Sequence, residues 1–484
     1  MASSPPLDLL IIGAGFSGMC TAILAREAGF TVRILEKGPD VGGVWRENTY
    51  PGAACDVPWH LYSFSFFKEV IFSRPYPQQE EILNYQKDCA RHYGLYDCAS
   101  FGVEVADARW DENRHLWVVT DTQGQHYEAR SLVSSVGLLS RPAWPNIPGR
   151  ESFAGTQFHS AEWRHDVDLS GKRVGVIGTG ASAIQFIPEI AKSAGHLTVF
   201  QRSAPYCLPR LDDPYGPLRR FWFTRMPGGD RPMRYAVWKF GETLGKLFES
   251  PDTASAKFFR WATRRFLESQ IQDPELRRKL TPDYQIGCKR ILFTSNYYPT
   301  YLRDNVTLHT DGLARITPAG VEDRNGVAHA FDVLIMGTGF KATEYLAPMR
   351  ITGEAGRDLH TTWGREVGAY LGMAVPGFPN FFMMYGPNTN LGSNSIIYMI
   401  ECQARYIVQA LQTLASHRQM EVTPEAFQGF RAEMQKRLGS MAWASGCTSW
   451  YQTDDGYNPT NWPGSTAEYR QRTETFTPAD YRLA

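Results

Sequence analysis

The sequence contains no two cysteines in a C-x-x-C arrangement. Its 484 residues include eight cysteines, which are spread over the whole chain. The spacing therefore indicates no zinc site, no disulfide framework and no redox-active dithiol, and we expect reduced thiols. At this length the chain is expected to form two or three domains.

An excess of charge of one sign is also absent. The chain has 50 Lys and Arg residues and 50 Asp and Glu residues, so its net field favours neither nucleic acid nor an anionic membrane. The uncharged residues 9–25 contain three glycines and follow no basic region, and the uncharged residues 370–400 contain three prolines. We expect no transmembrane span, no nucleic-acid partner and a cytoplasmic protein.

Two stretches of the chain have the pattern of a βαβ unit. Each has a short apolar run, a glycine-rich turn, a helix-compatible segment and a second apolar run, over residues 9–36 and 173–200. Such runs predict buried parallel strands joined by a crossover helix. Residues 332–336 predict a further buried strand, which is followed by Gly337-Thr-Gly339.

The first glycine turn has the spacing of a dinucleotide-binding fingerprint. Its first glycine permits a tight turn, its second lets the backbone approach a pyrophosphate, and its third lets the helix pack on the strand. Glu36 ends the next strand, where a carboxylate can accept hydrogen bonds from ribose hydroxyls but repels a 2′-phosphate. The site is therefore predicted to bind FAD or NAD. Its residues are Gly13, Ala14, Gly15, Phe16, Ser17, Gly18 and Glu36.

The second glycine turn differs at the position that selects the cofactor. Alanine replaces the third glycine, which the helix-packing position tolerates. After the second strand the chain has Arg202 where the first unit has an acid. A guanidinium suits a 2′-phosphate, so this site is predicted to prefer NADPH. Its residues are Gly178, Thr179, Gly180, Ala181, Ser182, Ala183, Arg202 and Ser203.

These motifs predict an α/β fold with two Rossmann-like dinucleotide-binding domains, one for FAD and one for NADPH. The FAD-binding domain is expected to cover residues 1–145 and, with the C-terminal segment, 331–484. The NADPH-binding domain is expected at 146–204 and 286–330. Residues 205–285 are basic, aromatic and mostly helix-compatible, so they predict a helical insertion in the second domain. We expect it to pack on its own domain, with a membrane surface or a partner as the alternative.

Further motifs resemble one flavoprotein family. Residues 153–163 follow the pattern F-x-G-x-x-x-H-x-x-x-W, and residues 42–45, 50–56 and 62–66 resemble the flavin domain of class B flavoprotein monooxygenases. Over nearly its whole length the chain resembles the Baeyer–Villiger branch of these enzymes. Arg164 departs from the branch, in which Pro or Asp usually follows the tryptophan.

The resemblance implies an FAD- and NADPH-dependent monooxygenase acting on a small-molecule ketone and O2. Through a C4a-peroxyflavin, it would insert one oxygen atom next to the carbonyl to give an ester or lactone. By resemblance, Lys289 binds the 2′-phosphate, Arg290 is catalytic over the flavin and pairs with Asp56, and Trp450 contacts the nicotinamide side. The other cofactor-binding residues expected are Lys37, Gly43, Val44, Trp45, Asp56, Tyr62, Val105 and Gln185.

Two alternative functions stay open. One is an N- or S-oxygenating flavin monooxygenase of the same fold, in which tyrosine usually stands in the place of Trp163. The other is a flavin disulfide reductase, which needs a close cysteine pair, or a non-catalytic nucleotide sensor. Within the linker run, we expect His159 and Trp163 to couple the two domains structurally rather than to act as catalytic groups. Lys341 stands where the family often has an acid.

Overall fold

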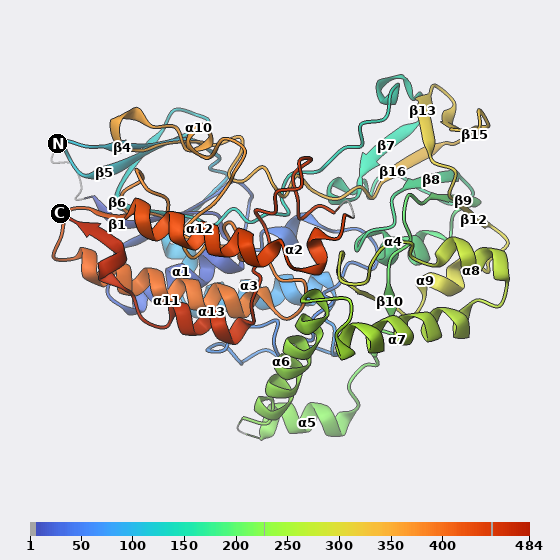
Figure 1. Ribbon diagram of the computed structural model, residues 1–484, viewed down its shortest axis with the longest axis horizontal. Helices are drawn as coiled ribbons and strands as arrows, with labels where there is room; N and C mark the ends of the chain where they lie inside the picture. Colours follow the sequence, from blue (N-terminus) through green and yellow to red (C-terminus); the bar gives the residue numbers. More distant parts are fainter. Residues whose placement is uncertain (1–5, 227, 447–448) are drawn as a thin grey trace.

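Two bodies, each built on a β-sheet, lie side by side in the molecule (Figure 1). The computed structural model describes residues 6–226, 228–446 and 449–484. Within these ranges, no helix has both the length and the apolar character needed to cross a membrane. The body on the left of Figure 1 contains β1 and α1, and the body on the right contains β8 and α4.

The first body is built on an eight-stranded sheet with the order β17-β4-β5-β6-β1-β2-β3, in which β18 also pairs with β6. Strand β1 pairs in parallel with β2 and β6, as a βαβ unit requires. Leu9 and Ile11 enter the core under α1 and α11, while Leu10 and Ile12 enter the core on the other face. The strands are β1 (Leu7–Ile12), β2 (Val32–Glu36), β3 (Ala99–Phe101), β4 (Val105–Asp111), β5 (Leu116–Asp121), β6 (His126–Ser134), β17 (Arg350–Thr352) and β18 (Phe381–Met383).

Helices from both ends of the chain cover this sheet. Helix α1 packs against α11, although about 370 residues separate them, because both bury apolar faces in one core. A short antiparallel pair, β19 (Met420–Val422) and β20 (Tyr481–Leu483), ties the C-terminus to this body. The helices are α1 (Phe16–Glu27), α2 (Val44–Glu47), α3 (Gln79–His92), α10 (Leu359–Trp363), α11 (Ile396–Leu414), α12 (Pro424–Leu438) and α13 (Thr466–Thr473).

The second body is built on a parallel five-stranded sheet with the order β12-β9-β8-β16-β7. A three-stranded antiparallel sheet, β13-β14-β15, lies beside it (Figure 1). These elements are β7 (Thr156–His159), β8 (Arg173–Ile177), α4 (Ala183–Ile190), β9 (His196–Phe200), α9 (Tyr297–Thr300), β12 (Val306–His309), β13 (Leu313–Thr317), β14 (Gly320–Asp323), β15 (Ala328–Ala330) and β16 (Val333–Met336).

Strand β16 corrects the predicted domain boundary. The sequence places a return to the first domain after residue 330, but β16 pairs with β7 and β8 of the second sheet. The chain rejoins the first sheet only at β17. A four-residue apolar run is equally suited to either sheet, so its sequence alone does not reveal which neighbours it pairs with.

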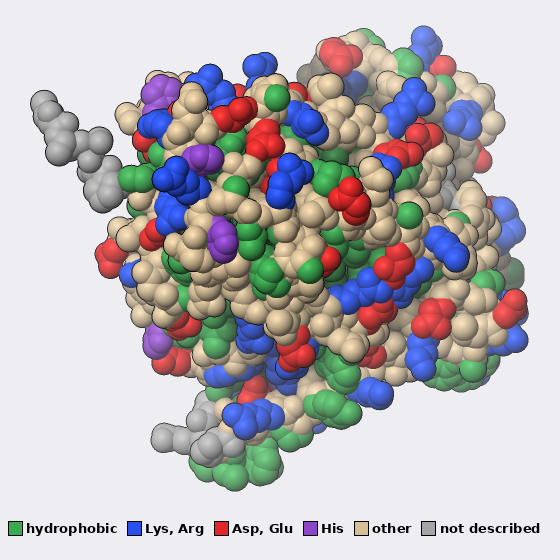
Figure 2. Space-filling view, turned by 60° about the vertical axis from the view of Figure 1, so that its left-hand side comes forward, with side chains coloured by type: hydrophobic (Ala, Val, Ile, Leu, Met, Phe, Trp, Pro, Cys, Tyr) green, Lys and Arg blue, Asp and Glu red, His purple; other side chains and the backbone are tan. Residues whose placement is uncertain are grey.

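The predicted insertion is helical. Its helices lie between β10 (Cys207–Leu208) and β11 (Leu292–Phe293), which pair with each other. The helices of residues 254–280 pack on the second body through Leu267 and Leu280, as expected, whereas several aromatic side chains of the insertion are exposed. Figure 2 shows apolar side chains gathered at the lower edge of the molecule, where α5 and α6 lie in Figure 1. The helices are α5 (Pro217–Arg225), α6 (Arg231–Gly245), α7 (Ala254–Gln270) and α8 (Pro274–Leu280), and the exposed aromatics include Trp222, Phe240, Phe258 and Trp261.

Candidate active site

A cavity of about 820 Å³ lies where the two bodies and helix α6 meet. It runs from the first glycine turn, past the start of α4, to the underside of α6. The predicted site residues that line it are Gly13, Gly15, Phe16, Ser17, Glu36, Lys37, Gly43, Val44, Trp45, Asp56, Tyr62, Val105, Ala181, Ser182, Gln185 and Arg290. Residues of the first fingerprint and residues of the second body therefore line the same cavity.

The first glycine turn leaves no room for a side chain at its tight point. Gly13 has φ +101°, and a Cβ atom there would lie 2.7 Å from the backbone oxygen of Ser135. Gly15 faces Gly43 across the turn, so two bare backbones border the cavity. Such a surface lets a pyrophosphate approach amide N–H groups closely, as the fingerprint predicts.

Glu36 is buried at the end of β2. Its carboxylate accepts hydrogen bonds from the N–H groups of Ala14 and Gly38, each at 2.8 Å, and forms an ion pair with Arg46 at 2.9 Å. The carboxylate thus fixes the glycine turn and faces the cavity, where it suits ribose hydroxyls. Lys37 points to the surface and pairs with Glu47 at 3.6 Å.

Aromatic side chains form one wall of the cavity. The indole N–H of Trp45 donates a hydrogen bond to the Tyr62 hydroxyl at 3.0 Å, and the Phe16 ring meets the Tyr62 ring edge-on. These contacts make an apolar wall in which the Trp45 N–H is already paired, which suits burial of an aromatic cofactor ring.

Arg290 and Asp56 meet at the centre of the cavity. Asp56 belongs to the first body and Arg290 follows the insertion, and the guanidinium donates a hydrogen bond to the carboxylate. Burial opposes the charged form of Arg290, but Asp56 more than offsets this and raises the pKa of the guanidinium above its ordinary value. The Arg290 Nε atom is buried and has no hydrogen-bond partner among the described residues. Arg290 therefore keeps its positive charge beside Asp56, and its buried Nε–H group is an unused donor.

Two tyrosines near Arg290 were missed by the sequence analysis. Burial raises the pKa of Tyr451 to about 12, against the opposing charge and backbone hydrogen bond of Arg290. Burial also raises the pKa of Tyr385, whose hydroxyl donates to Asn390 at 2.6 Å. Tyr385 lines the cavity. Trp450, predicted to contact the nicotinamide, is 37% exposed; neither it nor Tyr451 lines the cavity, and its predicted contact stays a prediction.

The second glycine turn leads to two neighbouring cations. Gly178 has φ +108°, and a Cβ atom there would lie 2.3 Å from the Gly337 oxygen. The Lys289 ammonium donates a hydrogen bond to the Ser203 hydroxyl at 2.9 Å. Burial lowers the pKa of Lys289, and the charge of Arg202 lowers it further. Two cations that repel each other next to a glycine turn are suited to share a phosphate, so these residues fit the 2′-phosphate of NADPH.

The linker run packs within the second body, where β7 is the edge strand of the sheet, and it does not line the cavity. His159 is buried, and burial lowers its pKa to about 4, so the imidazole is neutral. The Trp163 ring packs against Phe158 and Phe186. Arg164, which departs from the family pattern, forms an exposed ion pair with Asp166.

The structure also shows the surroundings of Lys341 and the state of the described cysteines. Lys341 forms an exposed ion pair with Glu344 at 3.1 Å, and its backbone N–H donates to Arg141. Among the described cysteines, Cys20, Cys55, Cys89, Cys98, Cys207 and Cys402 are free. Cys288 is disulfide-bonded, so the expectation of reduced thiols is wrong at that position. Sequence spacing could not reveal this, because only the fold brings distant cysteines together.

Comparison with known proteins agrees with this geometry. Residues 10–210 match a family model described as pyridine nucleotide-disulphide oxidoreductase. A Baeyer–Villiger monooxygenase of Pseudomonas aeruginosa is 42% identical to this chain, covering 100% of the chain and 92% of the relative. The crystal structure of OTEMO in complex with FAD and NADP has a TM-score of 0.91 at 29% identity, covering 100% of both chains. An oxidized steroid monooxygenase bound to NADP has a TM-score of 0.86 at 30% identity, covering 99% of both chains.

Proposed function

The chain belongs to the Baeyer–Villiger monooxygenase family, and on that premise we propose that Arg290 and Asp56 form its catalytic pair. The protein is an FAD- and NADPH-dependent monooxygenase that inserts one oxygen atom of O2 next to a ketone carbonyl, giving an ester or lactone. What the relatives leave open is which side chains of this protein perform the reaction, and for which class of ketone.

The observation that carries the proposal is the ion pair of Arg290 with Asp56 inside the cavity between the two bodies. One partner comes from each side of the cavity, so the charge is fixed where the two cofactors have to meet. The Nε donor of Arg290 is buried without a partner among the described residues, while the side chain as a whole is 33% exposed and lines the cavity.

Arg290 supplies a charge that does not depend on pH. A bound flavin, reduced by NADPH, supplies the electrons and activates O2. Negative charge then develops on oxygen, and a guanidinium fixed by Asp56 stabilises it without having to reorganise. The neighbouring phenols of Tyr385 and Tyr451 stay protonated at neutral pH because their pKa values are raised, so they carry no competing charge. The Tyr385 hydroxyl already donates to Asn390, which leaves the Tyr451 hydroxyl as the unused donor of the two.

We assign the two cofactors to the two bodies. FAD lies on the first glycine turn, where Glu36 suits an unphosphorylated ribose, and NADPH lies on the second, where Arg202 and Lys289 suit the 2′-phosphate. Under this assignment the FAD-binding domain is built on the eight-stranded sheet and the NADPH-binding domain on the five-stranded sheet.

Helix α6 forms the roof over the part of the cavity that is left for substrate. Met233, Val237, Phe240 and Leu244 from this helix line the cavity. Because this roof is apolar, we propose that the substrate is a bulky hydrophobic ketone; the likeness to a steroid monooxygenase supports this. The balanced charge of the chain supports two further proposals, a cytoplasmic location and the absence of a nucleic-acid partner.

The test compares wild type with Arg290→Ala over small and bulky ketones, and it measures NADPH oxidation, peroxide release and ester formation together. We expect wild type to form esters best from bulky ketones. The variant should retain FAD and lose ester formation by about 100-fold or more, the scale for removal of one donor to a developing oxyanion. Arg173→Ala, which breaks an exposed ion pair with Asp332, is the matched control. Full ester formation by Arg290→Ala would remove that residue from the mechanism.

A further inference from the structure

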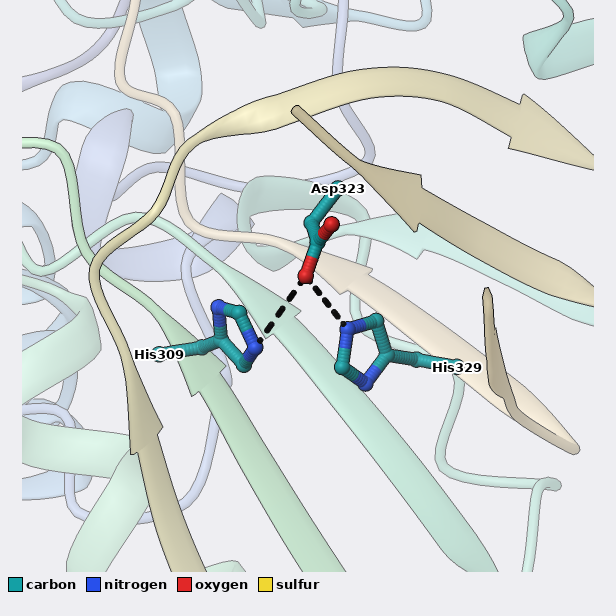
Figure 3. Close-up of side chains that lie close together, drawn as sticks. All are labelled: His309, Asp323 and His329. Atoms are coloured by element: carbon teal, nitrogen blue, oxygen red, sulfur yellow. Dashed lines mark hydrogen bonds and ion pairs between the residues drawn. The ribbon is translucent and has the colours of Figure 1, made fainter. Parts of the chain in front are cut away.

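A second cluster of chemically active side chains lies in the NADPH-binding body, outside the cavity. His309 ends β12, Asp323 ends β14, and His329 lies in β15. Figure 3 shows both imidazole rings turned toward one oxygen of Asp323. Nothing in the oxygenation reaction uses these residues.

The distances in this cluster are those of a metal site. The Asp323 Oδ2 atom lies 3.1 Å from His329 Nε2 and 3.5 Å from His309 Nε2, and the three ligand atoms all lie within 4.8 Å of one another. Ligands about 2.0–2.2 Å from a tetrahedral zinc ion are separated by about 3.3–3.6 Å. The 3.5 Å separation lies in that range and the 3.1 Å separation is slightly shorter, so these two pairs need only small side-chain shifts to hold an ion.

Asp323 is already arranged to act as a ligand through a single oxygen. Its Oδ1 atom accepts the N–H groups of Asn325 and Val327, each at 2.9 Å, which fixes the carboxylate and leaves Oδ2 for the histidines. The side chain of Asp323 is 2% exposed, while the histidines remain open enough for an ion to reach them.

An outer carboxylate completes the arrangement on the His309 side. The His309 Nδ1 atom is buried without a hydrogen bond in the described part of the chain, and it lies 3.5 Å from the Asp311 carboxylate. A histidine that binds a metal through one nitrogen commonly directs the other to a carboxylate, which fixes the ring and strengthens it as a ligand. The polar surroundings of His309 thus match those of a metal ligand on both sides of its ring.

The cluster is linked to the strand that carries the NADPH-selecting arginine. The Phe200 ring packs against both imidazole rings, with centroid distances of 5.4 Å and 5.7 Å. The carbonyl of His309 accepts the N–H of Gln201 at 2.8 Å, one residue before Arg202. An ion that joins β12 to the β13-β14-β15 sheet therefore also restrains the end of β9.

We propose that His309, Asp323 and His329 bind a divalent transition-metal ion, with zinc the best match to two imidazoles and one carboxylate. The ion is structural: it fastens the small antiparallel sheet to the edge of the NADPH-binding sheet. Hard cations such as Mg²⁺ prefer all-oxygen ligands and should not bind.

The test uses the full-length holoenzyme after treatment with a chelator, titrated calorimetrically with Zn²⁺ and, separately, with Co²⁺. We expect wild type to bind one ion per chain, to become more stable to heat on binding Zn²⁺, and to give with Co²⁺ the visible bands of a tetrahedral site without thiolate charge transfer. Asp323→Asn keeps the bonds from Asn325 and Val327, so it should fold, yet bind at least about tenfold more weakly. His329→Gln changes a more exposed side chain and is a second variant that should bind the ion more weakly than wild type.

His196→Gln is the matched control, because His196 is an exposed histidine at the start of β9 whose ring hydrogen-bonds to Thr307, outside the proposed site. It should bind Zn²⁺ as wild type does. Three results would overturn the proposal. In the first, the wild-type protein binds no ion. In the second, the Asp323→Asn and His329→Gln proteins bind Zn²⁺ as tightly as wild type. In the third, the Co²⁺ spectrum shows thiolate bands, which would place the ion at cysteines.

Discussion

Gln185 on α4 exchanges two hydrogen bonds with the backbone of Ala54, which belongs to the other body of the molecule. Its amide nitrogen donates to the Ala54 oxygen at 3.0 Å, and its amide oxygen accepts the Ala54 N–H at 3.3 Å. The Tyr50 hydroxyl donates to the same oxygen at 3.1 Å. The loop that carries Asp56 is therefore fixed from across the domain boundary, and the position of Arg290 depends on that loop.

Replacing Gln185 with leucine should loosen this loop without removing any catalytic group. The Ala54 N–H and C=O would be left without partners, at a cost of about 1–3 kcal/mol for a buried group. We expect the variant to oxidise NADPH but to release a larger fraction of the reducing equivalents as peroxide, because Asp56 no longer holds Arg290 in place. Parallel assays of ester and peroxide measure this fraction. Gln125→Leu, a surface change, should release the same fraction as peroxide as wild type does. If Gln185→Leu also releases no more peroxide than wild type, the contact between Gln185 and Ala54 is dispensable.

Arg202 and Lys289 should decide between NADPH and NADH. A hydrogen bond to a charged group is worth about 1.5–3 kcal/mol, so Arg202→Ala or Lys289→Met should raise the KM for NADPH about 10- to 100-fold. The KM for NADH should change little, because NADH has no 2′-phosphate. Steady-state kinetics with both cofactors give the comparison, and Lys192→Met, which removes a surface lysine on the same body, is the control. Equal losses with both cofactors would contradict the assignment.

The parts of this protein that could be predicted from sequence are those with local geometric requirements. A glycine at φ +101° next to a backbone oxygen can be recognised from its spacing, because no other residue fits. Arg290 and Asp56 were found only through the family resemblance, since 234 positions separate them. Tyr451 could not be found in this way: it reaches Arg290 from a C-terminal loop, and a lone tyrosine has no distinguishing pattern. The roof formed by α6 was equally hidden, because an amphipathic helix does not reveal what it covers.

Gly13 offers a direct test of the FAD site. In Gly13→Ala the new methyl group would lie 2.7 Å from the Ser135 oxygen, and the alanine backbone would have to adopt φ +101°. We expect the protein to lose most of its FAD, as measured by the flavin absorbance per chain after purification. Gly29→Ala separates the two causes, because Gly29 has φ +91° but has nothing within 4 Å of the added Cβ. That control should keep its flavin and lose only about 1–2 kcal/mol of stability from backbone strain; flavin loss in both variants would mean that strain alone is responsible.

His159 should make the stability of the protein fall at mildly acidic pH. Burial lowers its pKa from 6.5 to about 4, so the unfolded chain takes up a proton in a pH range where the folded protein does not. The stability due to the neutral imidazole is therefore complete above pH 6.5 and is lost as the pH falls toward 4. By pH 5 the loss should be about 2 kcal/mol of unfolding free energy.

His159→Asn removes this titration and keeps an oxygen that can accept the N–H of Ala161, as His159 Nδ1 does at 3.1 Å. Denaturant unfolding at pH 7 and pH 5 should show a smaller loss in the variant than in wild type. His60 is buried with a similarly lowered pKa, so the variant should keep part of the acid sensitivity and lose only the share that His159 contributes. If both proteins lose the same stability between the two pH values, His159 is protonated in the folded state, and the imidazole is not shielded from water as the packing of the linker requires.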